Sequence, residues 1–286
     1  MHKINKISPL EHPYLKITEC IDDLSDTLYY MGTLPDSRLP SVAIVGTRKP
    51  TPYGREVTYQ IASELARRGI VIISGLALGV DAIAHTAALD AGGGPIAVQA
   101  NGLHRLYPTT NPQLGTRITT SSGAIISEYD SGVEPMQHRF LERNRIVSGL
   151  ADAVIITEAA ARSGTLNTAA HALTQGKELY VVPGNITSPM SAGCNQLLSQ
   201  GASPLTSIDD LLMTLLPDYQ LPAHAMPHGN TALERAILDH LANGIRDGDT
   251  LLEKTGASTT DFSTALTMLE INGSVRSLGA NQWTLC

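Results

Sequence analysis

The sequence of 286 residues has few cysteines, and their spacing offers no recognisable metal site. Cys20, Cys194 and Cys286 lie far apart, without a CxxC or Cys/His pattern. This spacing argues against the common zinc motifs, and it favours a reducing compartment over an oxidising one. We therefore expect a cytoplasmic protein with no disulfide framework and no bound metal.

Long apolar runs are also missing. No stretch approaches the roughly 20 apolar residues that a membrane-spanning helix needs. The opening segment MHKINKISPLEHP lacks the apolar centre of a signal peptide. We expect a soluble protein that does not insert into membranes.

Familiar nucleotide-binding and catalytic signatures are absent as well. The sequence contains neither GxGxxG nor GxxxxGK[ST], which disfavours an ordinary dehydrogenase and a P-loop ATPase. It has no GxSxG nucleophile motif, and we expect no catalytic residues and no cofactor. Asp81 and His85 share a helix face but have no third ligand nearby, so we favour a hydrogen-bonded structural pair that supports Ser74-Gly75.

Positive charge is in short supply overall but unevenly distributed. The 20 Lys and Arg against 27 Asp and Glu give a net charge of -7, which argues against nucleic-acid binding by bulk charge. Residues 41–150 nevertheless hold ten basic and eight acidic residues, a balance of +2. The rest of the chain holds ten basic and nineteen acidic residues, a balance of -9. Residues 41–150 are therefore the segment in which we expect any local basic groove.

Short β-branched segments alternate with amphipathic helical segments over residues 41–215. The expected strands are VAIVG, IVIIS, PIAVQ, AIISE, AVIIT and ELYVV. This alternation predicts an α/β fold with a doubly wound, mostly parallel, Rossmann-like sheet. Residues 1–40 are interpreted as a short helical or irregular N-terminal lead-in.

The character of the sequence changes after the predicted sheet. Residues 216–230 contain three prolines and no periodicity, which is typical of a linker. Residues 231–286 predict three helices and a hairpin around Gly279-Ala280-Asn281, the pattern of a small winged-helix domain. Residues 221–286 carry four basic and seven acidic residues, so we expect protein interaction rather than duplex binding.

Glycine-rich polar segments follow the predicted strands, where open parallel sheets bind ligands. The candidate DNA-binding residues here are Gly46, Thr47, Arg48, Ser74, Gly75, Gly102, Ser163, Gly164 and Thr165. Glycine lets a backbone approach a phosphate, a helix N-terminus favours anions, and arginine binds phosphate in a bidentate manner. Any one of these glycines can instead serve a tight turn, but several on one edge favour a binding face.

A second cluster surrounds one of only two phenylalanines in the chain. Its candidate DNA-binding residues are Arg139, Phe140, Arg143, Asn144 and Arg145. Cations for phosphates and an aromatic ring for base stacking are typical of single-stranded nucleic-acid binding. The alternative is a solvated helix with Phe140 in the core and Arg143 or Arg145 in structural ion pairs.

Several motifs occur in an order that resembles the bacterial DNA-processing protein A family (DprA, also called Smf). They are VAIVGTRKPTPYG (42–54), SGLALGVDAIAH (74–85), SEYDSG (127–132), FLERNRIVSGL (140–150), SGTLNTAAHAL (163–173) and PGN with AGCNQLLSQGA (183–202). The resemblance covers about residues 27–215, and the tail is similar to the winged-helix domain of many members.

This resemblance implies a non-enzymatic protein that binds single-stranded DNA and loads the RecA recombinase during natural transformation. It also implies a homodimer formed through the Rossmann-like domain. The family's G-[ST]-R arginine falls on Arg48, and its F-x-x-R-N-R motif falls on Phe140, Arg143 and Arg145. The segment Gln99-Ala100-Asn101-Gly102 departs from the family's glycine-rich run, and Thr109-Thr110 stands where members often have a lysine.

Two other classes of function stay open from the sequence. One is an enzyme similar to nucleoside-monophosphate phosphoribohydrolases, with Glu158 as acid or base. The other is a nucleotide-sensing scaffold whose winged helix recruits a partner.

Overall fold

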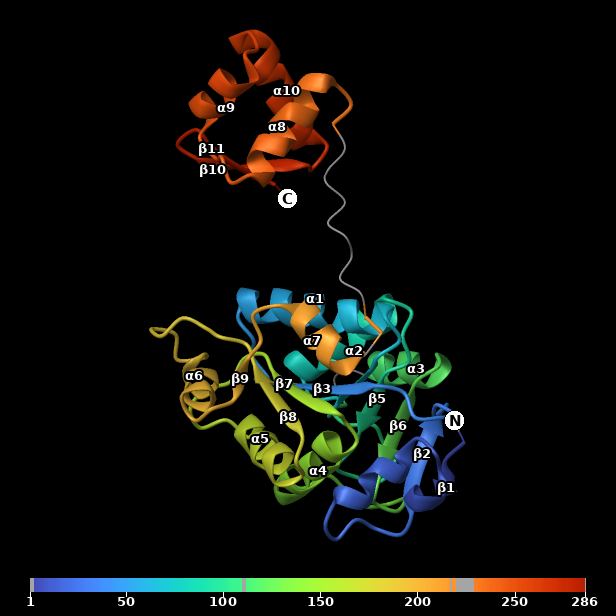
Figure 1. The fold of residues 1–286 in the computed structure, drawn as a ribbon. Helices are drawn as coiled ribbons and strands as arrows, with labels where there is room; N and C mark the ends of the chain where they lie inside the picture. Colours follow the sequence, from blue (N-terminus) through green and yellow to red (C-terminus); the bar gives the residue numbers. More distant parts are fainter. Residues whose placement is uncertain (1–2, 110–111, 217, 220–228, 286) are drawn as a thin grey trace. The chain divides into compact units, whose positions relative to one another are not determined.

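The computed structural model describes residues 3–109, 112–216, 218–219 and 229–285 (Figure 1). The chain divides into two compact units, residues 1–219 and 220–286, and each is described by itself. The division falls within the predicted linker 216–230, most of which lies outside the described residues.

The first unit is built on one nine-stranded sheet with the order β1-β2-β6-β5-β4-β3-β7-β8-β9. The strands are β1 (Asn5–Ile7), β2 (Leu28–Gly32), β3 (Ser41–Val45), β4 (Val71–Ser74), β5 (Ile96–Val98), β6 (Ala124–Ser127), β7 (Ala153–Ile156), β8 (Glu178–Val181) and β9 (Ser203–Pro204). From β3 the chain winds through β4, β5 and β6 on one side, then crosses to β7, β8 and β9 on the other. The strand order therefore reverses between β3 and β7, where such sheets form ligand sites.

Helices cover both faces of this sheet (Figure 1). One face carries α1 (Pro52–Arg67), α2 (Val80–Asp90) and α7 (Ile208–Leu215), and α3 (Pro112–Thr120) packs beside α2. The other face carries α4 (Gln137–Gly149), α5 (Thr165–Thr174) and α6 (Ala192–Ser199). Val42 and Ile44 of β3 pack on the α1 side, and Ala43 and Val45 pack on the α4 side. This alternation confirms the predicted doubly wound, mostly parallel α/β fold.

Two strands within residues 3–40 belong to the same sheet, so this segment does not stand before the sheet as a lead-in. Strand β2 pairs antiparallel with β6, and β1 pairs antiparallel with β2. The 3-10 helices η1 (Pro9–Glu11) and η2 (Leu15–Cys20) lie between these two strands, and Tyr14 and Leu15 are fully buried in the core. The predicted helical or irregular lead-in is wrong in this respect, because pairing with β6 stabilises short strands whose own apolar pattern is weak.

The second unit has the predicted three helices and hairpin. They are α8 (Ala232–Ala242), α9 (Gly248–Thr255), α10 (Thr259–Ile271), β10 (Val275–Gly279) and β11 (Gln282–Leu285). Its own core includes Phe262, Leu266 and Leu269. Ala280 and Asn281 adopt positive φ angles of 48° and 59° in the hairpin turn. Among the described residues of both units, no helix combines the length and apolarity needed to cross a bilayer.

Candidate nucleic-acid interface

The end of β3 approaches two other elements closely at the point where the strand order reverses. A Cβ on Gly46 would lie 2.6 Å from the Val80 side chain and 2.9 Å from the Glu158 carbonyl oxygen, so only glycine fits without displacement. The Thr47 N–H donates to that Glu158 carbonyl at 2.8 Å, and the Val80 N–H donates to the Thr47 carbonyl at 3.1 Å. The loop after β3 is thus fixed to the end of β7 and the start of α2.

A cavity of about 210 Å³ opens beside this loop. Nine of the fourteen predicted DNA-binding residues line this cavity. Their contact with a ligand is a prediction. The nine residues are Gly46, Thr47, Arg48, Phe140, Arg143, Asn144, Ser163, Gly164 and Thr165. The cavity therefore gathers the ends of two strand–helix loops and one face of α4.

Arg48 is the exposed cation of this cavity. Its guanidinium carbon lies 5.7 Å from the centroid of the Phe140 ring. Among the described residues, no carboxylate lies within ion-pair distance of Arg48. Its charge is therefore available to an anion that enters the cavity.

Arg143 lies beneath the cavity and is only 4% exposed. Its Nη1 donates to the carbonyl oxygen of Gly75 at 2.7 Å and to that of Val98. Burial lowers the pKa of Arg143 to about 10, and the nearby charge of Arg48 acts in the same direction. Arg143 thus links α4 to the ends of β4 and β5, and an anion would relieve its repulsion with Arg48.

Asp81 holds the loop after β4, as the sequence predicted. Its Oδ2 accepts from the Gly75 N–H at 3.0 Å and from the Ala77 N–H at 3.3 Å. These two bonds fix Leu76, which has a left-handed φ of 57°. The carboxylate therefore supports the backbone that accepts from Arg143.

His85 does not form the predicted hydrogen-bonded pair with Asp81. Neither of its ring nitrogens has a hydrogen-bond partner in the structure. Burial is the largest cause that lowers the pKa of His85 to about 3. The residue is a neutral core histidine, and the predicted pairing is wrong.

Two predicted arginines of α4 point away from the cavity. Arg145 donates to Glu128 at 2.7 Å, a structural ion pair in which both side chains are largely buried. Arg139 donates to the Glu134 carbonyl oxygen, and its guanidinium stacks over the Tyr129 ring at 5.3 Å. Positions 143 and 145 differ by about 200° around a helix, so the cavity face takes only one of them.

Three predicted residues of the strand-end loops have other surroundings. The Ser74 hydroxyl is fully buried and donates to the Ile44 carbonyl oxygen at 2.7 Å. The Gly102 N–H donates to the Val133 carbonyl oxygen at 2.8 Å, away from the cavity lining. Gly75 lines a smaller neighbouring hollow instead.

Tyr107 lies beside the cavity but is not among the residues predicted from the sequence. Its ring centroid lies 5.4 Å from that of Phe140, with the ring planes inclined by 50°. Together with Leu78 and Pro108 it lines the smaller hollow, which also includes Arg48 and Phe140. A Tyr-Pro pair in a chain with 4% aromatic residues was the available signal.

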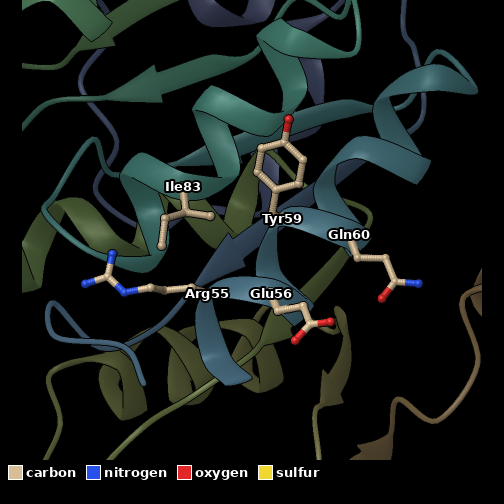
Figure 2. Close-up of a pocket in the computed structure, with 5 residues that line it drawn as sticks. All are labelled: Arg55, Glu56, Tyr59, Gln60 and Ile83. Atoms are coloured by element: carbon tan, nitrogen blue, oxygen red, sulfur yellow. The ribbon is translucent and has the colours of Figure 1, made fainter. Parts of the chain in front are cut away.

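A different hollow, of about 670 Å³, lies between α1 and α2 (Figure 2). It is lined by Arg55, Glu56, Tyr59, Gln60 and Ile83. Figure 2 shows that these polar side chains diverge instead of converging on one point. A ligand site needs polar groups that converge, so the larger volume of this hollow does not make it the candidate site.

The chain thus combines a Rossmann-like unit, which has a cation-bearing cavity at its switch point, with a winged-helix unit that follows it in sequence. This combination is that of a two-domain protein with a ligand site in its Rossmann-like domain. Residues 5–216 match the family model for DNA recombination-mediator protein A, and residues 221–281 match the DprA winged helix domain. The chain belongs to this family, which confirms the resemblance inferred from its motifs.

Individual relatives agree with this assignment. The chain is 36% identical over 259 residues to protein Smf of Escherichia coli (strain K12), covering 88% of this chain and 69% of that protein. It is 40% identical over 174 residues to DNA processing protein DprA of Bacillus subtilis (strain 168), covering 61% of this chain and 58% of that protein. The chain thus spans only part of each relative's length.

Two solved structures resemble the first unit. DNA processing protein A from Helicobacter pylori, a structure described for its single-stranded DNA binding mode, matches with a TM-score of 0.68 and 36% identity over 77% of this chain and 98% of that chain. DprA from Streptococcus pneumoniae matches with a TM-score of 0.69 and 36% identity over 77% of this chain and 76% of that chain.

Proposed function

We propose that the first unit binds single-stranded DNA in the cavity between the ends of β3 and β7. The observation that supports this proposal most strongly is the exposed Arg48. It has no carboxylate partner among the described residues and lies beside the Phe140 ring. The start of α5 at Gly164 and Thr165 lines the same cavity. A cation, a helix N-terminus and an aromatic ring together suit phosphate and base. The Helicobacter pylori relative described for single-stranded DNA binding supports this assignment.

A single strand fits this site better than a duplex. Base faces are open to an aromatic side chain only where the strand is unpaired. Phe140 is half-buried, with part of its ring at the cavity. Residues 221–286 carry more acidic than basic residues, so the winged helix offers little phosphate neutralisation for duplex binding.

The acid or base that the enzymatic alternative requires, Glu158, does not line this cavity, and the carboxylate that does line it, Asp81, holds the loop after β4. Glu158 is 3% exposed, and its two carboxylate oxygens accept from the Thr51 N–H at 2.8 Å and the Thr51 hydroxyl at 2.7 Å. It lines a separate hollow with Tyr53 and Asn185 rather than the cavity that contains Ser163 and Gly164. This geometry favours a non-enzymatic role.

Membership in the recombination-mediator family supports two finer proposals. The first is that the bound strand is passed to a RecA-type recombinase, as in natural transformation. The second is that the protein acts as a homodimer. Stimulated assembly of RecA on a strand coated with single-strand-binding protein tests the first, and the sedimentation mass of the full chain tests the second.

Fluorescence anisotropy with labelled oligonucleotides tests the central proposal. We expect the full chain to bind a single strand more tightly than a duplex of the same sequence. Competition by each unlabelled form, at one salt concentration, separates the two affinities. Preference for the duplex, or binding to neither form, would contradict the proposal.

A further inference from the structure

The loop that carries Arg48 runs over residues 46–51, from the end of β3 to the start of α1. Arg48 and Lys49 are exposed at its tip. Within the loop, the Lys49 N–H donates to the Thr47 hydroxyl at 3.2 Å. One internal bond between neighbouring residues contributes too little to fix the direction of Arg48. The position of Arg48 therefore depends on what holds the two ends of the loop.

Glu158, which follows β7, holds both ends of this loop. Its carbonyl oxygen accepts from the Thr47 N–H at 2.8 Å, at the beginning of the loop. Its carboxylate accepts at the other end, where Oε2 bonds to the Thr51 N–H at 2.8 Å and Oε1 to the Thr51 hydroxyl at 2.7 Å. A single residue of the sheet therefore sets where the loop begins and where it ends.

The carboxylate of Glu158 is buried and has no cationic partner. Among the described residues, no Lys, Arg or His lies within ion-pair distance of it. A Cβ on Gly54 would collide with its Oε2, so the carboxylate lies directly against the first turn of α1. The positive end of this 16-residue helix stabilises the negative charge. The carboxylate thus serves the backbone of the loop and of α1 rather than the Arg48 guanidinium.

A second buried bond joins the same two elements without contact to the loop. The hydroxyl groups of Thr58, on α1, and Thr157, next to Glu158, lie 2.8 Å apart. Both residues are buried. Their bond links α1 to the end of β7, as Glu158 does, but neither hydroxyl bonds to residues 46–51. This pair therefore allows a comparison in which α1 is anchored and the loop is not.

We propose that Glu158 is a positioning residue for single-strand binding, which acts by holding Arg48 at the cavity. The proposal rests on the proposed function, because Arg48 is the cation assigned to the strand's phosphate. Glu158 itself does not touch the strand. It orders the loop before the strand arrives, so less order has to be gained on binding. The reach of the carboxylate matters rather than its charge, because a negative charge near the cavity opposes a phosphate.

Two substitutions in the full chain separate reach from charge. Glu158→Asp keeps the charge but is one methylene group shorter, so its oxygens withdraw from Thr51. Glu158→Gln keeps the length, and its amide can accept from the Thr51 N–H and donate to the Thr51 hydroxyl. We expect Glu158→Asp to bind oligothymidylate about 10-fold more weakly than the parent, and Glu158→Gln to bind within about two-fold of it. An effect of charge alone would leave Glu158→Asp like the parent and make Glu158→Gln bind more tightly.

A second pair of measurements distinguishes the positioning of Arg48 from general support of the fold. In an Arg48→Ala background, Glu158→Asp should lower the affinity by less than about two-fold, because the cation that it positions is gone. Amide hydrogen exchange over residues 46–51 should be faster in Glu158→Asp than in the parent, and unchanged in Glu158→Gln. Thr58→Val is the matched control. It removes the bond between the two threonine hydroxyls and should leave both the affinity and this exchange unchanged.

The results separate failure of the positioning role from failure of the proposed function. If Glu158→Asp binds the strand as tightly as the parent while Arg48→Ala does not, the positioning role is wrong and strand binding stands. An equal loss with Glu158→Asp in the parent and Arg48→Ala backgrounds would also overturn it. Should Glu158→Asp not fold, Thr51→Val removes one of the three bonds and should lower the affinity about 3-fold in the parent alone. If the parent does not bind, or Arg48→Ala binds as tightly as the parent, both proposals fall.

Discussion

The two units use charged side chains for different purposes. In the winged-helix unit, acidic residues stabilise helix N-termini: Asp247 accepts from the Thr250 N–H at 2.9 Å, and Glu234 completes a capping box with Thr231. In the Rossmann-like unit, Arg48 has no carboxylate partner among the described residues and faces a cavity. The net charge of -7 thus combines acid that supports folding with a few cations that are open to a ligand.

Removal of Arg143 should affect the first unit most strongly. Arg143→Ala leaves the Gly75 and Val98 carbonyls without their donor and Asp81 without the nearby cation. We expect a loss of about 3 kcal/mol in the free energy of unfolding of this unit, because an uncompensated charge stays buried. Thermal unfolding of the full chain measures it, with the winged-helix transition as internal control. An unchanged first transition would contradict the role of Arg143 as a buried link.

Acid should destabilise the first unit through His85. Its pKa is about 3 when folded, below the ordinary 6.5, so the unfolded chain binds the proton first as pH falls. This contribution to stability is present above about pH 6.5 and is lost between there and about pH 3. At pH 5 the loss is about 2 kcal/mol.

Denaturant titrations at pH 7 and pH 5 compare the parent with His85→Leu. The variant should lose less stability on acidification, because it has no imidazole to protonate when unfolded. Burial raises the pKa of Asp81, so this carboxyl group makes stability depend on pH in the opposite direction. Asp81 is present in both proteins, so the comparison isolates His85. Equal acid sensitivity of the two proteins would show that His85 does not carry the effect.

Gly164→Ala should separate binding from folding. A Cβ there would meet only the Leu141 side chain, at 4.0 Å, so we expect the free energy of unfolding to stay within about 0.5 kcal/mol of the parent. Affinity for a single strand should fall about 5-fold, because the methyl group obstructs a phosphate at the start of α5. Unchanged affinity would place the phosphate elsewhere.

Removal of the winged-helix unit should have the smallest effect. A chain that ends at Tyr219 keeps the cavity and loses a unit with an excess of acidic residues. We expect its affinity for a single strand to stay within about two-fold of the full chain at physiological salt, where distant charges are screened. A large loss would show that the winged helix contributes to strand binding.

Much of the fold could be predicted because its buried strands are strongly apolar. The segment around Val42 to Val45 is buried on both faces, so its composition alone marks a central strand. Strand β1, with its mixed pattern in Asn5–Ile7, has no such signal and depends on pairing with β2. Its place in the sheet is set by tertiary context rather than by local sequence.

The candidate site was predictable in part of its residues but not in the role of each one. The strand ends indicated Arg48, whereas Phe140 and Arg143 were predicted as a separate cluster, and the fold brings both sets to one cavity. Helical spacing could have shown that Arg143 and Arg145 face different ways, but not that Glu128 pairs with Arg145. Tyr107 reaches Phe140 only through folding of its loop, which no local pattern reveals.

The salt dependence of single-strand affinity tests the central claim most directly. Arg48→Ala should reduce the slope of log affinity against log salt by about 0.7, the value for one phosphate contact on a single strand. Arg67→Ala is the matched control. Arg67 is 58% exposed, bonds to Glu64 and lies at the end of α1, shortly before the start of β4 and therefore away from the carboxyl ends of the strands. It should leave the slope unchanged. An unchanged slope with Arg48→Ala, or an equal reduction with Arg67→Ala, would contradict the claim that Arg48 binds the strand's phosphate.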